Sequence, residues 1–266
     1  GSCGPAEMVR SDPSAALDAS LRAPVSAAAA LASAYVDTEG APSGGDRFFD
    51  GDPLGFHGNP KQMFKGWLLV GVLFKVGAVP FHSWIPDVYQ GAPTPVTAFM
   101  AATTKIAAFG ALLRLLTVAV PELKDQWRPV LWVIAIITMA LGTLTAIAQK
   151  DVKRMLAYSA VAHTGFLLTG VIAASPAGVS ATLFYLAAYG FTTVGAFAFV
   201  TMVRDRDGRE QTELLRWAGL GKRYPVAGAV FSLILLSFAG IPLTSGFISK
   251  FAVFTAAAGG GAIPLV

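Results

Sequence analysis

Three lysines lie within otherwise apolar stretches of the sequence, where a charged side chain is unusual: Lys75, Lys105 and Lys250. Lys75 and Lys105 each lie about ten residues into such a stretch. At about 1.5 Å per helical residue, both are expected about 15 Å deep, near the middle of a membrane. Placing a lysine there costs about 2.5–3.5 kcal/mol. Because this depth exceeds the reach of one side chain, both lysines are expected to act in place, whereas Arg114 can extend to the surface.

The chemistry open to a buried lysine is proton exchange. Burial disfavours the charged ammonium, so a neighbouring charge or water decides where the proton resides. A row of such groups is a proton relay, which His82 and His163 can join, since imidazole exchanges protons near neutral pH. The structural alternative stays open for all five residues. A lysine can bind carbonyls freed at a helix break, and a histidine can be packed and hydrogen-bonded.

Other polar residues in the same region have weaker signals. Asp87 is expected to pair with a basic residue or to cap a helix. Hydroxyl side chains can bond between helices, which is their commoner use, or can hold water. This group comprises Ser159, Thr164, Thr192, Thr193, Thr244 and Ser245.

Apolar segments of membrane-spanning length position these residues. The windows 95–116, which contains Lys105, and 129–149 are each long enough for one span. Residues 155–203 carry no charge over 49 residues, which is too long for one crossing. The turn Ser175-Pro176-Ala177-Gly178 divides them into spans at about 155–173 and 179–203.

Two further apolar stretches, 66–92 and 226–258, are interrupted by Gly77-Ala78-Val79-Pro80 and Gly240-Ile241-Pro242. Proline removes a backbone donor and clashes with the preceding turn, so both stretches are expected to be discontinuous helices. The second lies five crossings after the first, so the two should run in opposite directions. Paired discontinuous helices in an inverted repeat are typical of secondary transporters, with the ion site at the break.

Composition agrees with a membrane protein. The chain has 54% hydrophobic and 14% charged residues, against roughly a quarter charged in soluble proteins, which excludes a soluble globular enzyme. Its single cysteine excludes a disulfide framework and a thiolate metal cluster. The loops on one side of the predicted spans carry nine Lys and Arg and those on the other side two. The first side is therefore expected to face the cytoplasm, and the basic excess does not indicate a nucleic-acid partner.

The predicted fold is all-α: a polytopic transmembrane helix bundle of about six spans, with discontinuous helices and an antiporter-like inverted repeat, over residues 63–266. Residues 1–62 are rich in Gly, Pro, Ser and Asp and carry an acidic excess. They are left unassigned and expected to be loosely ordered.

Three segments identify a family. Residues 74–116, 149–170 and 238–254 (the last FAGIPLTSGFISKFAVF) resemble, in order, the subunit N family of bacterial respiratory complex I. This is the antiporter-like membrane subunit of the proton-pumping NADH–quinone oxidoreductase. The likeness covers about residues 66–266 and implies six of the family's fourteen helices, seven to twelve. No residue of 1–62 matches the glutamate that pairs with the lysine of helix seven.

The resemblance implies roles for the candidate residues. Lys75, Lys105 and Lys250 match the lysines of helices seven, eight and twelve, part of a hydrated axis that carries protons while quinone is reduced elsewhere. Lys75 would be the central gate and the other two lysines relays, with His82 and His163 as intermediates. The chain would bind no cofactor or metal, the complex would use NADH and quinone, and the partners would be other complex I subunits in the inner (plasma) membrane.

Three alternatives remain. A subunit of a multi-component sodium–proton antiporter resembles the same fold. A membrane redox protein holding haem would need an axial pair, for which His82 and His163 are the candidates. A scaffold whose lysines only bind carbonyls at helix breaks would keep pumping after loss of Lys105.

Overall fold

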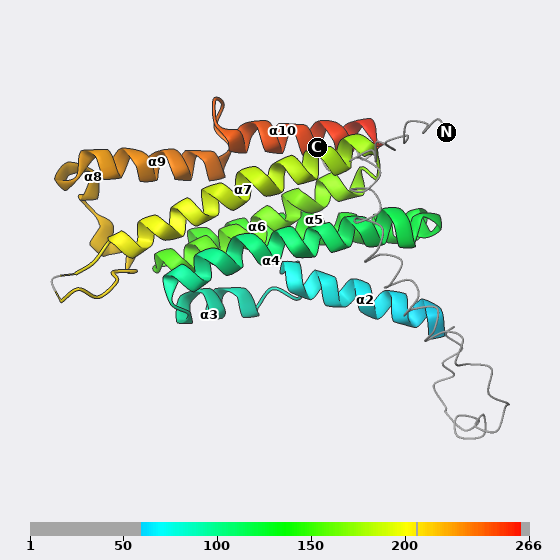
Figure 1. Cartoon of the computed structure of the whole chain (residues 1–266), viewed down its shortest axis with the longest axis horizontal. Helices are drawn as coiled ribbons and strands as arrows, with labels where there is room; N and C mark the ends of the chain where they lie inside the picture. The colour runs from blue at the N-terminus through cyan, green and yellow to red at the C-terminus, as the bar shows by residue number, and fades with distance from the viewer. Residues whose placement is uncertain (1–59, 206, 262–266) are drawn as a thin grey trace, which may run out of the picture. The chain divides into compact units, whose positions relative to one another are not determined.

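The computed structural model describes residues 60–205 and 207–261, with side chains from residue 66 onward. These residues belong to one compact helical unit (Figure 1). The segment 1–62 lies outside the described residues apart from its last three, which begin the first described helix. Short helical segments join the main elements: η2 (Leu115–Ala119), η3 (Pro121–Leu123), η4 (Leu214–Trp217) and α8 (Leu220–Arg223).

Four helices of the described part are long and apolar enough to cross a membrane, which confirms the four predicted continuous spans. Two begin with a side-chain cap, which satisfies amide groups that a helix leaves free at its start. Asp151 accepts from the amide of Arg154 at 2.9 Å, and Ser175 accepts from the amide of Gly178 at 3.1 Å. The four are α4 (Thr94–Arg114), α5 (Lys124–Ile147), α6 (Val152–Ile172) and α7 (Pro176–Met202).

The two predicted discontinuous helices are present: α2 (Pro60–Val76) with α3 (Trp84–Gly91), and α9 (Pro225–Ala239) with α10 (Ser245–Gly259). Their first halves end in the same way. Gly77 and Gly240 adopt φ of 76° and 79°, and the next amide donates back to the carbonyl five residues earlier, at 3.0 and 3.1 Å. This is the glycine-based end of a helix known as the Schellman motif.

The structure corrects the expected cause of the breaks. The sequence predicts that proline ends the helices, but each helix ends at glycine, before the proline of the motif is reached. A positive φ ends the regular helix, and glycine adopts it most readily because it has no Cβ atom. The proline then prevents the helix from resuming at once.

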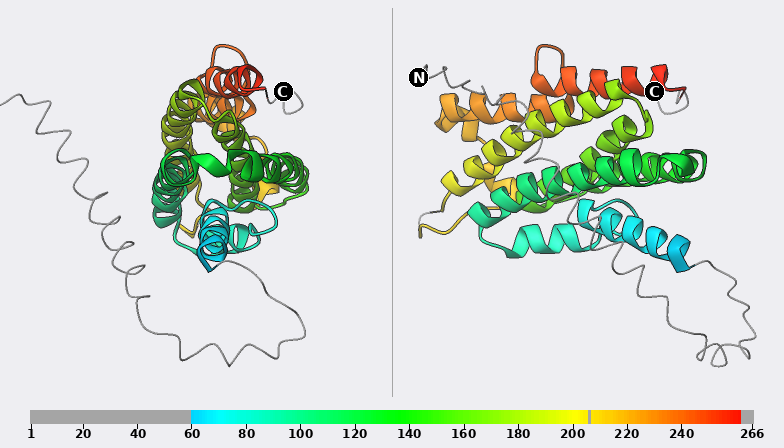
Figure 2. Two further views of the ribbon diagram at one scale, coloured as in Figure 1. Left: turned by 90° about the vertical axis from the view of Figure 1, so that its right-hand side faces the viewer. Right: turned by 45° about the vertical axis from the view of Figure 1, so that its right-hand side comes forward.

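The two discontinuous helices lie on opposite sides of the bundle and run in opposite directions (Figures 1 and 2). In both views α2 and α3 border the bundle on one side and α10 borders it on the other. The expectation of an inverted arrangement is therefore confirmed for the described helices.

Helix α6 is the centre of the unit. Most of it is buried, whereas most of α5 faces outward. Small residues bring the two helices close together, as is common in membrane bundles. A Cβ atom on Gly142 would lie 2.8 Å from the Cα of Ala162, and one on Gly165 would lie 2.8 Å from the carbonyl oxygen of Ala135.

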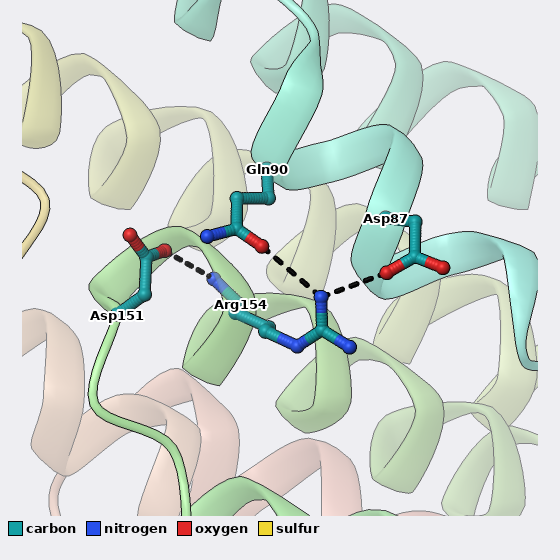
Figure 3. A network of polar contacts seen from close by, with 4 residues as sticks. All are labelled: Asp87, Gln90, Asp151 and Arg154. Carbon is teal, nitrogen blue, oxygen red and sulfur yellow. Dashed lines mark hydrogen bonds and ion pairs between the residues drawn. The ribbon is translucent and has the colours of Figure 1, made fainter.

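Basic side chains tie the discontinuous helices to α6 at both of its ends. Arg128 donates through Nε to the carbonyl of Ile172 at 2.9 Å and through Nη2 to that of Gly260, so it joins the last turns of α6 and α10. At the other end, Arg154 of α6 pairs with Asp87 of α3 at 2.7 Å and donates to Gln90 at 3.0 Å (Figure 3). The pairing predicted for Asp87 is thus confirmed.

We expect Gly142→Ala to lower the thermal unfolding midpoint of the purified protein in detergent by several degrees. The added methyl meets the main chain of α6, and overpacking of this kind costs about 1–3 kcal/mol. Gly110→Ala is the matched control, because a Cβ atom there has no neighbour within 4 Å. Equal midpoints for the two variants would contradict the close α5–α6 contact.

Candidate functional site

Three of the five candidate residues gather between α4, α6, α7 and the second discontinuous helix. They are Lys105 on α4, His163 on α6 and Lys250 on α10. Aromatic rings of α6, α7 and α9 separate them. The other two candidates, Lys75 and His82, belong to the first discontinuous helix and lie apart from this cluster.

Lys105 is fully inside the bundle, with 2% of its surface exposed. It lies on the face of α4 that carries Ala98, Ala101 and Ala108, all of them buried. Its Nζ donates to the carbonyl oxygen of Ala160 on α6 and lies 4.8 Å from the centre of the Tyr189 ring. The amine therefore stays at depth, as predicted, and does not extend to a surface.

No carboxylate faces Lys105 within the described residues, where the ion pairs are Arg154–Asp87 and Arg216–Glu213. A backbone carbonyl and the face of a tyrosine ring stabilise its positive charge instead. Such neutral partners compensate a buried charge less well than a carboxylate does. An amine held in this way can give up its proton without leaving an anion behind in the apolar interior.

His163 is buried and enclosed by aromatic rings. Its ring centre lies 4.9 Å from that of Tyr189, 5.4 Å from Phe238 and 6.0 Å from Phe166. Its Nδ1 lies 2.7 Å from the hydroxyl of Tyr185. Either atom can be the donor, depending on which ring nitrogen carries the proton. The histidine is thus both packed and connected to a second group that can exchange a proton.

A cavity of about 10 Å³ joins His163 to the second break. Its wall includes Tyr185, Ser237 of α9, and Gly246 and Ser249 of α10. This volume is close to the least that a single water needs, and the wall offers the polar partners that a buried water requires. Ser237 and Ser245 also place their hydroxyls 3.3 Å apart across the break.

Lys250 binds the main chain at the second break. Its Nζ donates to the carbonyls of Phe238 and Ala239 at 2.8 and 3.0 Å, and lies 4.6 Å from the centre of the Phe166 ring. These are carbonyls at the end of α9, which a helix leaves without partners. The structural use that the sequence left open for this lysine is therefore present.

Lys75 differs from the other two lysines. It is exposed on the described part of the chain and lines a groove of about 620 Å³ between α2 and α4, together with Trp67, Thr103 and Thr104. No hydrogen-bond partner of its Nζ lies among the described residues. The carbonyls near the first break have other donors, since Trp84 Nε1 donates to Phe74 at 3.0 Å and Thr164 Oγ1 to Val76 at 2.9 Å.

His82 lies between the two halves of the first discontinuous helix and is half-buried. Its Nδ1 is buried without a hydrogen-bond partner among the described residues. The ring centre lies 6.5 Å from that of Tyr158 on α6. The structure therefore does not bring His82 into the cluster around His163.

Sequence reasoning missed three residues of the region. Tyr185 and Tyr189 lie one turn apart on the inner face of α7 and both contact His163. Their spacing of one helical turn places both on the same face of a helix, but it does not show which residues that face contacts. The sequence predicts Lys153 as a loop charge, yet it is 5% exposed and donates to the carbonyl of Ala92 at the end of α3, at 2.7 Å.

The predicted hydroxyl residues divide between two uses. Thr164 and Ser245 make contacts between elements. Thr192 bonds its own helix at Ala188, and Thr244 caps α10 by accepting from the amide of Phe247. As for metal ligation, no three His, Cys, Asp or Glu side chains come together within residues 60–205 and 207–261.

Comparison with known proteins agrees with the segments singled out in the sequence. Over 202 residues the chain is 70% identical to NADH-quinone oxidoreductase subunit N of Mycobacterium tuberculosis, a match that covers 75% of this chain and 38% of that protein. The chain thus spans less than half the length of the relatives it matches. This similarity confirms the resemblance to the subunit N family.

Solved structures share the fold. The structure of respiratory complex I from Thermus thermophilus contains a chain with a TM-score of 0.65 and 38% identity, over 80% of this chain and 46% of that one. The Mrp complex from Dietzia contains a chain with a TM-score of 0.70 and 28% identity, over 77% of this chain and 38% of that one. A family model described as NADH:quinone oxidoreductase/Mrp antiporter, TM matches residues 49–266, and the chain belongs to this family.

Proposed function

We propose that this chain forms part of the proton-translocating membrane subunit of an NADH–quinone oxidoreductase. The observation that carries the proposal is Lys105, an amine buried in an apolar bundle with a carbonyl and a tyrosine ring as its partners. A lysine at such a position is costly to insert and marks an ion or proton pathway by default. The 70% identity to a subunit N supports the same assignment.

The proton path runs along the row formed by Lys105, His163 and Lys250. Lys105 passes its proton towards the Tyr189 side of the aromatic cluster, where His163 and the Tyr185 hydroxyl form a pair that can exchange one. The small cavity beside them leads to the second break, where Lys250 lies. Charging one of these sites disfavours charging its neighbour, so the sites load and empty in turn.

Lys75 acts as the gate of the row. It faces the open groove between α2 and α4, so its amine is accessible to a carboxylate that enters the groove. His82, whose Nδ1 is free of protein partners in the described part, serves as an intermediate on the same side. Pairing holds the proton on Lys75, and loss of the pair releases it towards Lys105.

The electrons do not pass through this chain. NADH and quinone react elsewhere in the complex, and this subunit supplies proton-exchanging side chains. Other membrane subunits cover the groove and the remaining apolar faces. The protein lies in the plasma membrane of a bacterium, with the loop around residues 204–223, rich in Arg, on the cytoplasmic side.

The alternative is a subunit of a multi-component sodium–proton antiporter. The Mrp complex chain favours it, with the TM-score of 0.70 noted above, although its identity is 28% against 38% for the complex I chain. Sodium dependence separates the two. We expect proton uptake by vesicles that carry the assembled complex to be driven by NADH and to be unchanged when potassium replaces sodium. Uptake that needs sodium and no NADH would favour the antiporter.

We expect Lys105→Met to reduce proton pumping and coupled quinone reduction severalfold in membrane vesicles that carry the assembled complex. Loss of a positioned proton-transfer group slows the step that it serves. Arg114→Gln is the matched control on the same helix, because Arg114 is exposed near the end of α4. Unchanged pumping by an assembled Lys105→Met complex would favour the scaffold function instead.

Two substitutions separate the roles of Lys250. Lys250→Gln keeps an amide that can donate to the carbonyls of Phe238 and Ala239 but cannot be protonated. We expect it to preserve the thermal stability of the complex and to reduce pumping. Lys250→Met removes both donors and leaves the carbonyls of Phe238 and Ala239 at the end of α9 without them, so this variant should also lose stability. Pumping at the normal rate by Lys250→Gln would show that Lys250 serves only the break.

A further inference from the structure

The hydroxyl of Thr164 lies between the main chain beside Lys75 and the carbonyl that holds Lys105. Thr164 is on α6 and has no exposed surface. Its Oγ1 lies 2.9 Å from the carbonyl oxygen of Val76, the last residue of α2 and the neighbour of Lys75 in sequence. It also lies 3.2 Å from the carbonyl oxygen of Ala160, which accepts from Lys105 Nζ.

A count of protons and lone pairs decides which bond the hydroxyl makes. A hydroxyl has one proton to donate, and a carbonyl oxygen has two lone pairs. Inside an α-helix, the amide of Thr164 already donates to the carbonyl of Ala160. Lys105 takes the second lone pair, so the hydroxyl is directed to Val76, in agreement with the shorter of its two distances.

If Lys105 left the carbonyl of Ala160, the hydrogen bonds open to the Thr164 hydroxyl would change. The oxygen of Ala160 would regain a lone pair, and bonding to the carbonyl four residues earlier is a common position for a threonine hydroxyl in a helix. The carbonyl of Val76 would then lose its donor. Val76 is fully buried and ends α2 at the first break. A buried carbonyl without a donor favours rearrangement of the turn that carries Lys75.

We propose that Thr164 is a positioning residue that couples the two lysines: the hydroxyl holds the end of α2 while Lys105 is docked on Ala160, and releases it when Lys105 moves. This inference rests on the proposed proton-translocating function. It adds a connection from Lys105 to the first break, through a residue that is not itself protonated or deprotonated in the relay.

The other side chains that hold the first break do not meet Lys105. Thr138 on α5 accepts from the amide of Val79 at 3.0 Å and donates to the carbonyl of Ile134 on its own helix. Trp84 Nε1 donates to the carbonyl of Phe74. Among the described residues, Thr164 alone bonds to the first break and shares an acceptor with Lys105.

Three substitutions in the full-length subunit test the coupling, with the complex assembled in membrane vesicles. Thr164→Val keeps the shape and removes the hydroxyl, whereas Thr164→Ser keeps the hydroxyl. Thr169→Val is the matched control, since Thr169 is equally buried on α6 and bonds only the carbonyl of Gly165 on its own helix. The readout is the rate of proton pumping coupled to quinone reduction.

We expect Thr164→Val to lower this rate by about fivefold, the factor that corresponds to one net hydrogen bond. Thr164→Ser should restore it to within about twofold, and Thr169→Val should match the unsubstituted complex. If Thr164→Val does not assemble, Thr164→Cys provides the same test, because a thiol is a weak donor. A pumping rate for Thr164→Val or Thr164→Cys equal to that of Thr169→Val would overturn the proposal.

A double substitution then separates coupling from a structural role. In a Lys105→Met background there is no amine on the carbonyl of Ala160 for Thr164 to respond to, so Thr164→Val should reduce pumping no further. Independent, multiplicative losses would contradict the coupling. Normal pumping by Lys105→Met alone would refute the proposed function, whereas a loss with Lys105→Met and none with Thr164→Val would refute only the role of Thr164.

Discussion

Every backbone donor and acceptor within a membrane needs a partner inside the protein, and this requirement shapes the described part of the chain. Two helices are interrupted, and each interruption frees carbonyls and amides at depth. At the first break, Thr138, Thr164 and Trp84 supply partners from side chains. At the second, Lys250 supplies two donors from one amine. The two breaks share a glycine-based helix end but are completed by different chemistry.

The three lysines differ in how they relate to the two breaks. Lys75 precedes its break and is not used to complete it, so its amine is free to face the groove. Lys250 follows its break and is bound to it. Lys105 lies between the two elements and shares a carbonyl of α6 with Thr164. Movement of the amine of Lys105 or Lys250 would therefore change hydrogen bonds to the main chain.

The spans and breaks could be predicted from the sequence, because each depends on a short stretch of residues: an uncharged window or a Gly–Pro motif. The burial of Lys105 also followed from its position within a long apolar segment. The exposure of Lys75 did not, since it depends on what lies beside α2. The partners of Tyr185 and Thr164 could not be predicted either, because a polar side chain in an apolar helix does not reveal which neighbouring helix it faces. The burial of Lys153 could not be predicted because its charged neighbours in the sequence are typical of a loop.

The most direct test of the account is a map of the complete, assembled complex at a resolution that shows ordered water. The buried amine of Lys105, the His163–Tyr185 pair and Lys250 should be joined by a continuous file of waters and polar side chains, with a water in the small cavity beside His163. A dry, closely packed apolar barrier between Lys105 and His163, persisting in every state of the working complex, would contradict the account.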